Sequence, residues 1–276
     1  MLGLGGSITN RAKPPIFDFR KIKGLIGWWD FSNKSSITDA SSNPITNNTE
    51  IYQIDNLAFE LEKTISTKRK ALGKFLQGTD SLNRPVWLSA GYAEFTSGDK
   101  LQATISVGAI DTNRVSDSTI SQRAYTSFFV LHHNSGTVSG ASDIFFQMKS
   151  DNLNMRVIHL VEAASDGYIS VDLPGSKTEV RTASGQGATS NKFLLTTVKN
   201  SASSNKMYVN GDTSNGTSSG NAGDGSLDMA ANSANVLVEL GDTWAGRYHE
   251  CVIFNRILDD REIKKVEKFL IKKHGI

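Results

Sequence analysis

A series of short segments in which apolar and polar residues alternate runs from residue 84 to residue 254 and constrains the fold more than any other feature. Examples are RPVWLSAGYAEFTSGDKLQATISV at 84–107, AYTSFFVLHH at 124–133 and KMYVNGDT at 206–213. A period of two places successive side chains on opposite faces of a strand, so one face can pack while the other meets water. About ten such strands, separated by polar turns, predict an all-β fold of two packed antiparallel sheets.

The composition of the 276-residue chain supports this fold and narrows the classes of partner. Hydrophobic residues make up 38%, yet thirteen Phe and four Trp are enough to fill a core between two sheets. The formal net charge of +2 creates no strong field, so we expect no nucleic-acid partner and no membrane surface. The single cysteine excludes an internal disulfide and a cysteine-based zinc site.

The first residues, MLGLGGSITNRAKPP, lack the basic segment and apolar run of a secretory signal. Nowhere do eighteen apolar residues follow one another, so the sequence predicts no transmembrane helix. We therefore expect a soluble protein.

Residues 1–20 differ from the rest and are expected to form an extended N-terminal arm, ahead of a single domain at 21–276. Glycines near the start supply flexibility, and a Pro-Pro pair enforces an extended path. Apolar residues in such an arm need somewhere to dock. The arm is either a disordered tail or a strap that orders against a neighbouring subunit. For the second alternative, the candidate partner-binding residues are Leu2, Leu4, Ile8, Pro14, Pro15, Ile16 and Phe17.

The chain is predicted to close with a helix at 259–274. Asp259 or Asp260 can cap its first turn, and Glu262 stands at the position that a capping box requires. Gly275 can end the helix. One apolar face, enough to dock on a sheet, consists of Ile263, Val266, Phe269 and Leu270.

Two other segments break the β pattern. Residues 57–76 show apolar spacing that is partly helical and predict one or two short helices at most. Residues 211–235 are low in complexity and predict a long polar loop. Its aspartates follow no known calcium-loop spacing, so we interpret them as solvated turn residues and expect no metal.

His249, Glu250 and Cys251 stand side by side and raise the question of a nucleophile with its base. Strand alternation predicts that His249 and Cys251 share one face, about 7 Å apart, with Glu250 on the other. That separation is too long for a nucleophile–base hydrogen bond, and cysteine among apolar neighbours is usually a core residue. We therefore expect no catalytic residue here. The sequence also lacks the paired-carboxylate motif of sandwich glycosidases and any nucleotide-binding loop, so no cofactor is expected.

Several motifs together resemble the concanavalin A-like, laminin-G-type jelly-roll domains. They are GLIGWWDFS at 24–32, the Phe95, Gly98 and Leu101 strand motif, and YVNG at 208–211. The ending matches at Gly246, Glu250, Phe254, Asn255, Arg256, Leu258 and Glu262. The resemblance covers most of residues 24–276 and implies a two-sheet antiparallel jelly-roll sandwich with a short C-terminal helix. It implies little about function, because this fold carries lectins, lyases, hydrolases and inert modules.

The start, MLGLGGSI, is similar to that of structural proteins from T4-like marine tailed bacteriophages. This resemblance implies a non-enzymatic virion component, in the head decoration, neck, tail or fibre, attached through the arm. It further implies capsid or tail subunits as partners, many copies or a homo-oligomer in the particle, and assembly in the host cytoplasm.

Two alternatives stay open. The first is a lectin-like module that reads host surface glycans, with Trp87, Trp244 or Tyr248 as candidate aromatics if these do not simply pack in the core. The second is a glycan hydrolase or lyase. Two carboxylates, or a cluster of His, Tyr and Arg side chains in one concave cleft, would favour it.

Overall fold

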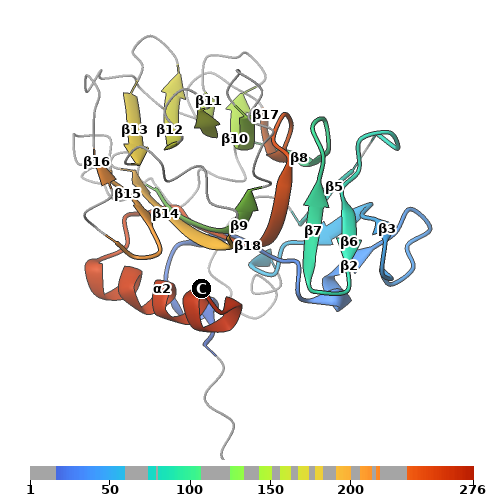
Figure 1. The fold of residues 1–276 in the computed structure, drawn as a ribbon, viewed down its shortest axis with the longest axis horizontal. Coiled ribbons are helices and arrows are strands. Elements are labelled where there is room, and N and C mark those ends of the chain that lie inside the picture. The colour runs from blue at the N-terminus through green and yellow to red at the C-terminus, as the bar shows by residue number, and fades with distance from the viewer. Residues whose placement is uncertain are drawn as a thin grey trace, which may run out of the picture.

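A computed structural model confirms the predicted all-β class: it contains two antiparallel sheets and one C-terminal helix (Figure 1). The structure describes residues 17–59, 74–78, 80–106, 125–133, 143–150, 156–162, 167–173, 178–182, 191–199, 206–212, 216–217 and 235–276.

The eight-stranded sheet, counted over the described residues, runs in the order β15-β14-β9-β18-β7-β6-β3, and β1 also pairs with β18. Its central strands, β9 and β18, are long and pair with each other antiparallel. The strands are β1 (Leu25–Asp30), β3 (Thr49–Glu50), β6 (Val86–Leu88), β7 (Tyr92–Phe95), β9 (Tyr125–His133), β14 (Phe193–Lys199), β15 (Lys206–Val209) and β18 (Gly246–Phe254).

The ten-stranded sheet, over the same described ranges, runs in the order β16-β13-β12-β11-β10-β17-β8-β5-β4-β2. The strands are β2 (Ile37–Thr38), β4 (Gln53–Asp55), β5 (Phe75–Gln77), β8 (Lys100–Ser106), β10 (Asp143–Ser150), β11 (Arg156–Glu162), β12 (Gly167–Leu173), β13 (Thr178–Thr182), β16 (Gly216–Thr217) and β17 (Asn235–Gly241). Short 3₁₀ turns, η1 (Phe19–Lys21) and η2 (Lys34–Ser36), flank β1.

The main core lies between the two sheets, as strand alternation requires. In β4, β5 and β8, alternate residues point inward and are buried, and these strands contribute Ile54, Leu76 and Leu101. Large aromatic side chains fill the space between the sheets, and removing their surface from water drives the packing. They include Trp29, Phe31, Phe95, Phe129, Phe145, Trp244 and Tyr248.

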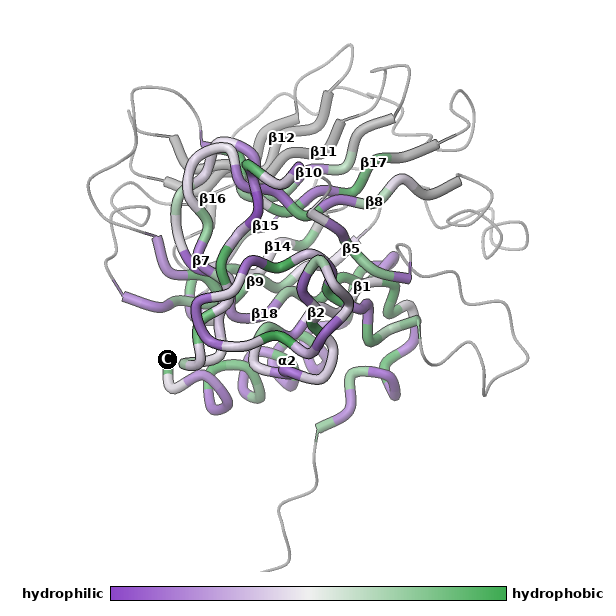
Figure 2. Tube along the Cα trace, turned by 90° about the vertical axis from the view of Figure 1, so that its right-hand side faces the viewer, coloured by the Kyte–Doolittle hydropathy of each residue, from purple (hydrophilic) through white to green (hydrophobic). Residues whose placement is uncertain are grey.

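A second core lies on the outer face of the eight-stranded sheet, under helix α2 (Asp260–His274). The capping box predicted from Asp259 and Glu262 is present, and Gly275 ends the helix in the left-handed conformation that glycine adopts without strain. Figure 2 shows hydrophobic and hydrophilic residues alternating along the helix. The buried members of this second core include Phe128, Leu194, Val252, Phe254, Ile263, Val266 and Leu270.

The chain enters this second core near its described start. Phe19 is fully buried, and Phe17 stacks on Phe269 of α2 with ring centroids 4.9 Å apart. Both residues fall inside the arm expected at 1–20, so part of that segment packs against the domain. The division at residue 20 stays a prediction, because residues 1–16 lie outside the described residues.

The two other irregular segments are described only in part. Phe75–Gln77 form β5, so the end of the 57–76 segment is a strand and not the short helix expected there. The reason is tertiary: Leu76 is needed in the main core, which overrides a weak helical pattern. Residues 60–73 and most of the loop expected at 211–235 lie outside the described residues, although β16 falls within the latter range.

Candidate functional site

The structure corrects the face assignment of the His-Glu-Cys segment. The register of β18 against β9 shifts between Tyr248 and Glu250, which makes His249 the extra residue of a bulge. The bulge lies where β18 changes its other neighbour from β7 to β1. Tyr248 and Cys251 therefore both belong to the main core, whereas His249 and Glu250 contact residues on the outer face.

The prediction that His249 and Cys251 share a face is thus wrong, but they still do not form a nucleophile–base pair. Cys251 is buried between the sheets, and burial followed by the nearby Glu250 charge raises the pKa of its thiol well above the usual value. A buried thiol that resists ionisation is a poor nucleophile. His249 lies on the opposite side of the sheet, so this segment supports no nucleophilic catalysis.

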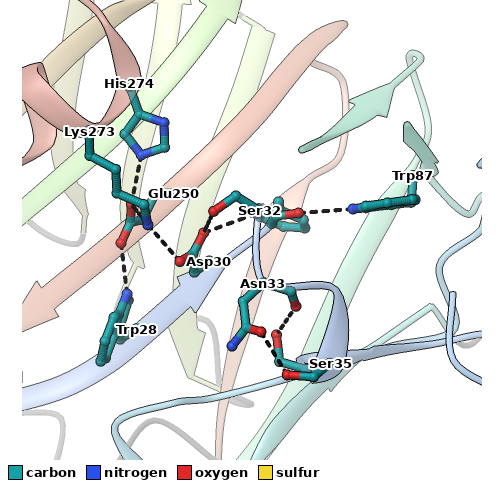
Figure 3. A network of polar contacts seen from close by, with 11 residues as sticks. Trp28, Asp30, Ser32, Asn33, Ser35, Trp87, Glu250, Lys273 and His274 are labelled. Atoms are coloured by element: carbon teal, nitrogen blue, oxygen red, sulfur yellow. Dashed lines mark hydrogen bonds and ion pairs between the residues drawn. The ribbon is translucent and has the colours of Figure 1, made fainter. Parts of the chain in front are cut away.

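Glu250 instead holds α2 to the sheet (Figure 3). Its carboxylate, which is fully buried, accepts hydrogen bonds from Trp28 Nε1 at 2.8 Å, Lys273 Nζ at 2.7 Å and His274 Nε2 at 2.7 Å. Lys273 also binds Asp30 at 2.6 Å. Burial opposes the charge on Lys273, yet the two carboxylates keep the pKa of the lysine above its ordinary value. In this Glu250 cluster every charged group has a partner, and the contacts join α2 to β1 and β18.

The three aromatic residues weighed for sugar binding all pack in the core. Trp87 is 5% exposed, and Trp244 and Tyr248 are fully buried. Trp87 Nε1 donates to the carbonyl of Phe31 at 2.9 Å. The core-packing alternative is therefore confirmed for all three, and glycan binding would need a different surface.

A row of amide and carboxylate side chains crosses the outer face of the ten-stranded sheet. The register pairs Gln53 of β4 with Gln77 of β5, and Gln77 with Gln102 of β8. It then pairs Gln102 with Glu239 of β17, and Glu239 with Gln147 of β10. Their sequence neighbours on each strand point into the main core, which places these five side chains on the outer face.

Hydrogen bonds hold the row at both ends. At one end, Gln77 Nε2 donates to Gln53 Oε1 at 3.3 Å, and Gln53 Nε2 donates to Asp55 Oδ1 at 2.9 Å. At the other end, Gln147 Nε2 donates to Glu239 Oε1 and also to Asp242 Oδ2, the latter at 3.3 Å. These bonds fix the orientation of the Gln53, Gln77 and Gln147 amides within the folded protein.

The two ends of the row differ in exposure. Gln147 and Glu239 are buried, whereas Gln53, Gln77 and Gln102 are half-buried and reach the surface. Beside the accessible end, Phe75 of β5 is also half-buried and lies on the same face, paired in register with Asp55. We call the accessible end, Gln53, Asp55, Phe75, Gln77 and Gln102, the amide patch.

The amide patch combines the groups that a sugar-binding surface requires. Each glutamine amide offers both donors and an acceptor, which matches hydroxyl groups that also donate and accept. An aromatic ring beside them can cover an apolar ring face of a ligand. No sequence motif points to this patch, because its members are distant along the chain; only the strand register brings them together.

The described part of the chain shows no metal centre or membrane helix. In these ranges, no three His, Cys, Asp or Glu side chains converge as a metal ion would need. Among the described helices, none is long and apolar enough to cross a membrane.

Of the predicted partner-binding residues, only Phe17 lies in the described part of the chain. Its ring packs on Phe269, and its centroid lies 5.1 Å from that of the Phe19 ring, so the side chain packs within the domain. Leu2, Leu4, Ile8, Pro14, Pro15 and Ile16 lie outside the described residues, and their role stays a prediction.

No protein-family model and no curated protein matches the chain. Among solved structures, the fold is similar to a Trypanosoma rangeli sialidase in complex with sialic acid, with TM-score 0.53 and 11% identity over 91% of this chain. It is also similar to the receptor binding domain of botulinum neurotoxin D, with TM-score 0.50 and 12% identity over 92% of this chain. The matches cover 33% and 54% of those chains, respectively. At these identities they show the sandwich fold alone.

Proposed function

We propose that this chain is a non-catalytic glycan-binding module whose ligand lies on the amide patch of the ten-stranded sheet. The observation that carries the proposal is the run of Gln or Glu at one level on five neighbouring strands. A face that only meets water needs no such uniform choice, because threonine, serine or lysine serve equally well there.

The dimensions of the amide patch suit a short oligosaccharide. Neighbouring strands lie about 4.8 Å apart, so the three accessible glutamines span about 10 Å. Hydrogen bonds along the row fix the amide orientations, which lowers the entropy lost on binding. The buried pair of Gln147 and Glu239, which are bonded to each other, continues the row beyond Gln102.

The same groups argue against hydrolysis. A glycosidase needs two carboxylates that reach the scissile bond. Glu239 and Asp242 are close, since both accept from Gln147 Nε2, but Glu239 is only 2% exposed. The Glu239 carboxylate is enclosed and already accepts from Gln147, so it is not available to act on a substrate, and binding without cleavage is the function that the geometry favours.

The test is a glycan array with the wild-type protein, followed by calorimetry on the best ligand. The Gln77→Ala variant should weaken binding about tenfold, because two directed hydrogen bonds with the ligand are lost. Thr104→Ala is the matched control: Thr104 is exposed on the outer face of β8, two residues beyond Gln102. No ligand on the array, or equal affinities for all three proteins, would refute the proposal, and release of shortened sugars would favour the hydrolase alternative.

A second candidate role is attachment of the module to a larger assembly, as expected for a virion component. Phe17 joins the second core under α2, on the outer face of the eight-stranded sheet. The described chain therefore begins on the side away from the amide patch, and an assembly bound at Phe17 would leave the patch accessible. Deleting residues 2–16, which spares Phe17, should leave the domain folded and abolish incorporation into phage particles. Normal incorporation would refute this role.

A further inference from the structure

The outer face of the eight-stranded sheet has a second part, beyond the end of α2, which is polar and rich in cations. Arg247 of β18 pairs in register with His132 of β9 on one side and Glu94 of β7 on the other. Lys192 directly precedes Phe193, whose partner is Leu131, so Lys192 lies opposite His132. A row of side chains with three basic members therefore crosses this part of the face.

Tyr92 is the centre of this cluster. The guanidinium carbon of Arg247 lies 5.0 Å from the centroid of the Tyr92 ring, close enough for a cation–π contact. The His249 imidazole lies 5.2 Å from the same ring, at an interplanar angle of 52°. On its other side, His249 is 5.8 Å from His274 of α2.

His249 carries an unsatisfied polar atom. The residue is only 8% exposed, yet within the described residues no hydrogen-bond partner reaches its Nε2. Buried polar atoms are rarely left without a partner, because the loss of hydration is then uncompensated. When the proton of the neutral ring sits on Nε2, this nitrogen is a donor, and an acceptor from a ligand would satisfy it.

The electrostatic environment of His249 is positive. Burial is the largest effect, and together with the surrounding charges it lowers the pKa of His249 to about 3. The charged or titratable groups that contribute come from the segment before β14, from β9, from β18 itself and from α2: Lys192, His132, Arg247 and His274. Lys192 and Arg247, which are charged at neutral pH, would stabilise a bound anion, and the two histidines would do so when protonated.

We propose that Tyr92, Arg247 and His249 form a second binding site, which takes an oxyanion group such as the carboxylate or sulfate of an acidic ligand. Arg247 supplies N–H donors, His249 supplies Nε2, and Tyr92 offers a ring face to the ligand beside the charged group. Lys192 adds positive charge from the segment before β14, and His132 of β9 adds more when it is protonated.

Glu94 does not block this site. Arg247 donates through Nε to Glu94 Oε1 at 3.1 Å, which uses one of its five N–H donors. The two side chains are 31% and 34% exposed, and so exposed a pair contributes little and can rearrange. The site is independent of the amide patch, because the two lie on the outer faces of different sheets.

The test follows the imidazole signals of His249 by NMR while the wild-type protein is titrated with sodium glucuronate or with sodium sulfate at constant ionic strength. Both probes should give saturable shifts of Nε2, and tighter binding of one identifies carboxylate or sulfate as the preferred group. Glucose, the neutral control, should give none. The bound anion should also raise the pKa of His249, since it stabilises the protonated ring.

Arg247→Gln should weaken binding by on the order of tenfold, because a charge-assisted hydrogen bond is lost. The matched control is Arg84→Gln: Arg84 lies 5.2 Å from the Tyr52 ring and 3.7 Å from Glu50, but this arrangement lacks the histidine. Absence of a saturable His249 shift in the wild type, or an equal loss of affinity in both variants, would overturn the proposal. The wild-type titration decides the matter even if a variant fails to fold.

Discussion

The outer faces of the two sheets are used in different ways. On the eight-stranded sheet, α2 covers apolar residues and closes a buried set of charges around Glu250. On the ten-stranded sheet, the corresponding positions of β4, β5 and β8 carry half-buried glutamines and an aromatic ring. One outer face therefore contributes stability, and the other keeps hydrogen-bonding groups accessible.

This contrast follows from the free energy that apolar and amide side chains gain when they are removed from water. Apolar side chains gain free energy on burial, so the face under α2 stabilises the fold. Half-buried amide groups contribute little, because the hydrogen bonds that they make with one another replace bonds to water. Mutations on the two faces should accordingly affect different measurements.

The largest effect on the free energy of unfolding is expected at the Glu250 cluster under α2. Lys273→Met keeps the length of the side chain but leaves the Glu250 carboxylate, which is fully buried, without its ammonium partner. Removing one partner of a buried ion pair costs about 3–5 kcal/mol, and the partial exposure of Lys273 places the expected loss at the lower end. Urea unfolding would measure it. Lys272→Met, at the exposed neighbouring position, should change the free energy of unfolding by less than about 0.5 kcal/mol.

The free energy of unfolding should also decrease at low pH, because the pKa of His249 is lowered in the folded protein. Its folded pKa of about 3 is below the unfolded value, so the unfolded chain takes up a proton first as the pH decreases. The stability contribution is complete above about pH 6.5 and is lost towards pH 3, with about 1 kcal/mol lost between pH 7 and 5.5. His249→Phe should remove this part of the pH dependence, and an unchanged slope would show that His249 is not held neutral.

A smaller effect is expected at the start of α2. Asp259 Oδ1 accepts a hydrogen bond from the backbone N–H of Glu262 at 2.8 Å. In return, Glu262 Oε2 accepts one from the backbone N–H of Asp259. Asp259→Ala should lower the free energy of unfolding by about 1 kcal/mol, while Asp259→Ser keeps most of the cap. Equal losses in the two variants would mean that the cap bond does not matter.

The smallest stability effect is expected at the amide patch. Gln53→Ala removes a half-buried side chain whose bonds join only other polar surface groups, so unfolding should change by no more than about 0.5 kcal/mol. Glycan affinity should nevertheless fall. A variant that loses several kcal/mol of stability would show that the row is structural, and the contrast between the two faces would disappear.

The sequence predicted the features that depend on local pattern. Alternation identified the strands and the sandwich, and the spacing of Asp259, Glu262 and Gly275 identified the closing helix and its caps. The sequence did not predict features that depend on which strand lies next to a segment. The bulge at His249 depends on the change of neighbour along β18, which leaves no local signal, and it reversed the expected face of that residue.

The amide patch was missed for a related reason. Gln53, Gln77 and Gln102 lie on different strands, separated by 24 residues or more, and each glutamine alone is an ordinary surface residue. Only the pairing of β4, β5 and β8 places them at one level. The aromatics chosen from the sequence were the large ones, which the core requires, whereas Phe75 had been assigned to a helical segment.

The most direct test of the account is backbone NMR of the wild-type protein with its best glycan from the array. We expect chemical-shift changes concentrated in β4, β5 and β8, around Gln53, Gln77 and Gln102, with α2 unaffected. Changes confined to Tyr92, Arg247 and His249, or spread evenly over the sandwich, would contradict the assignment of glycan binding to the ten-stranded sheet.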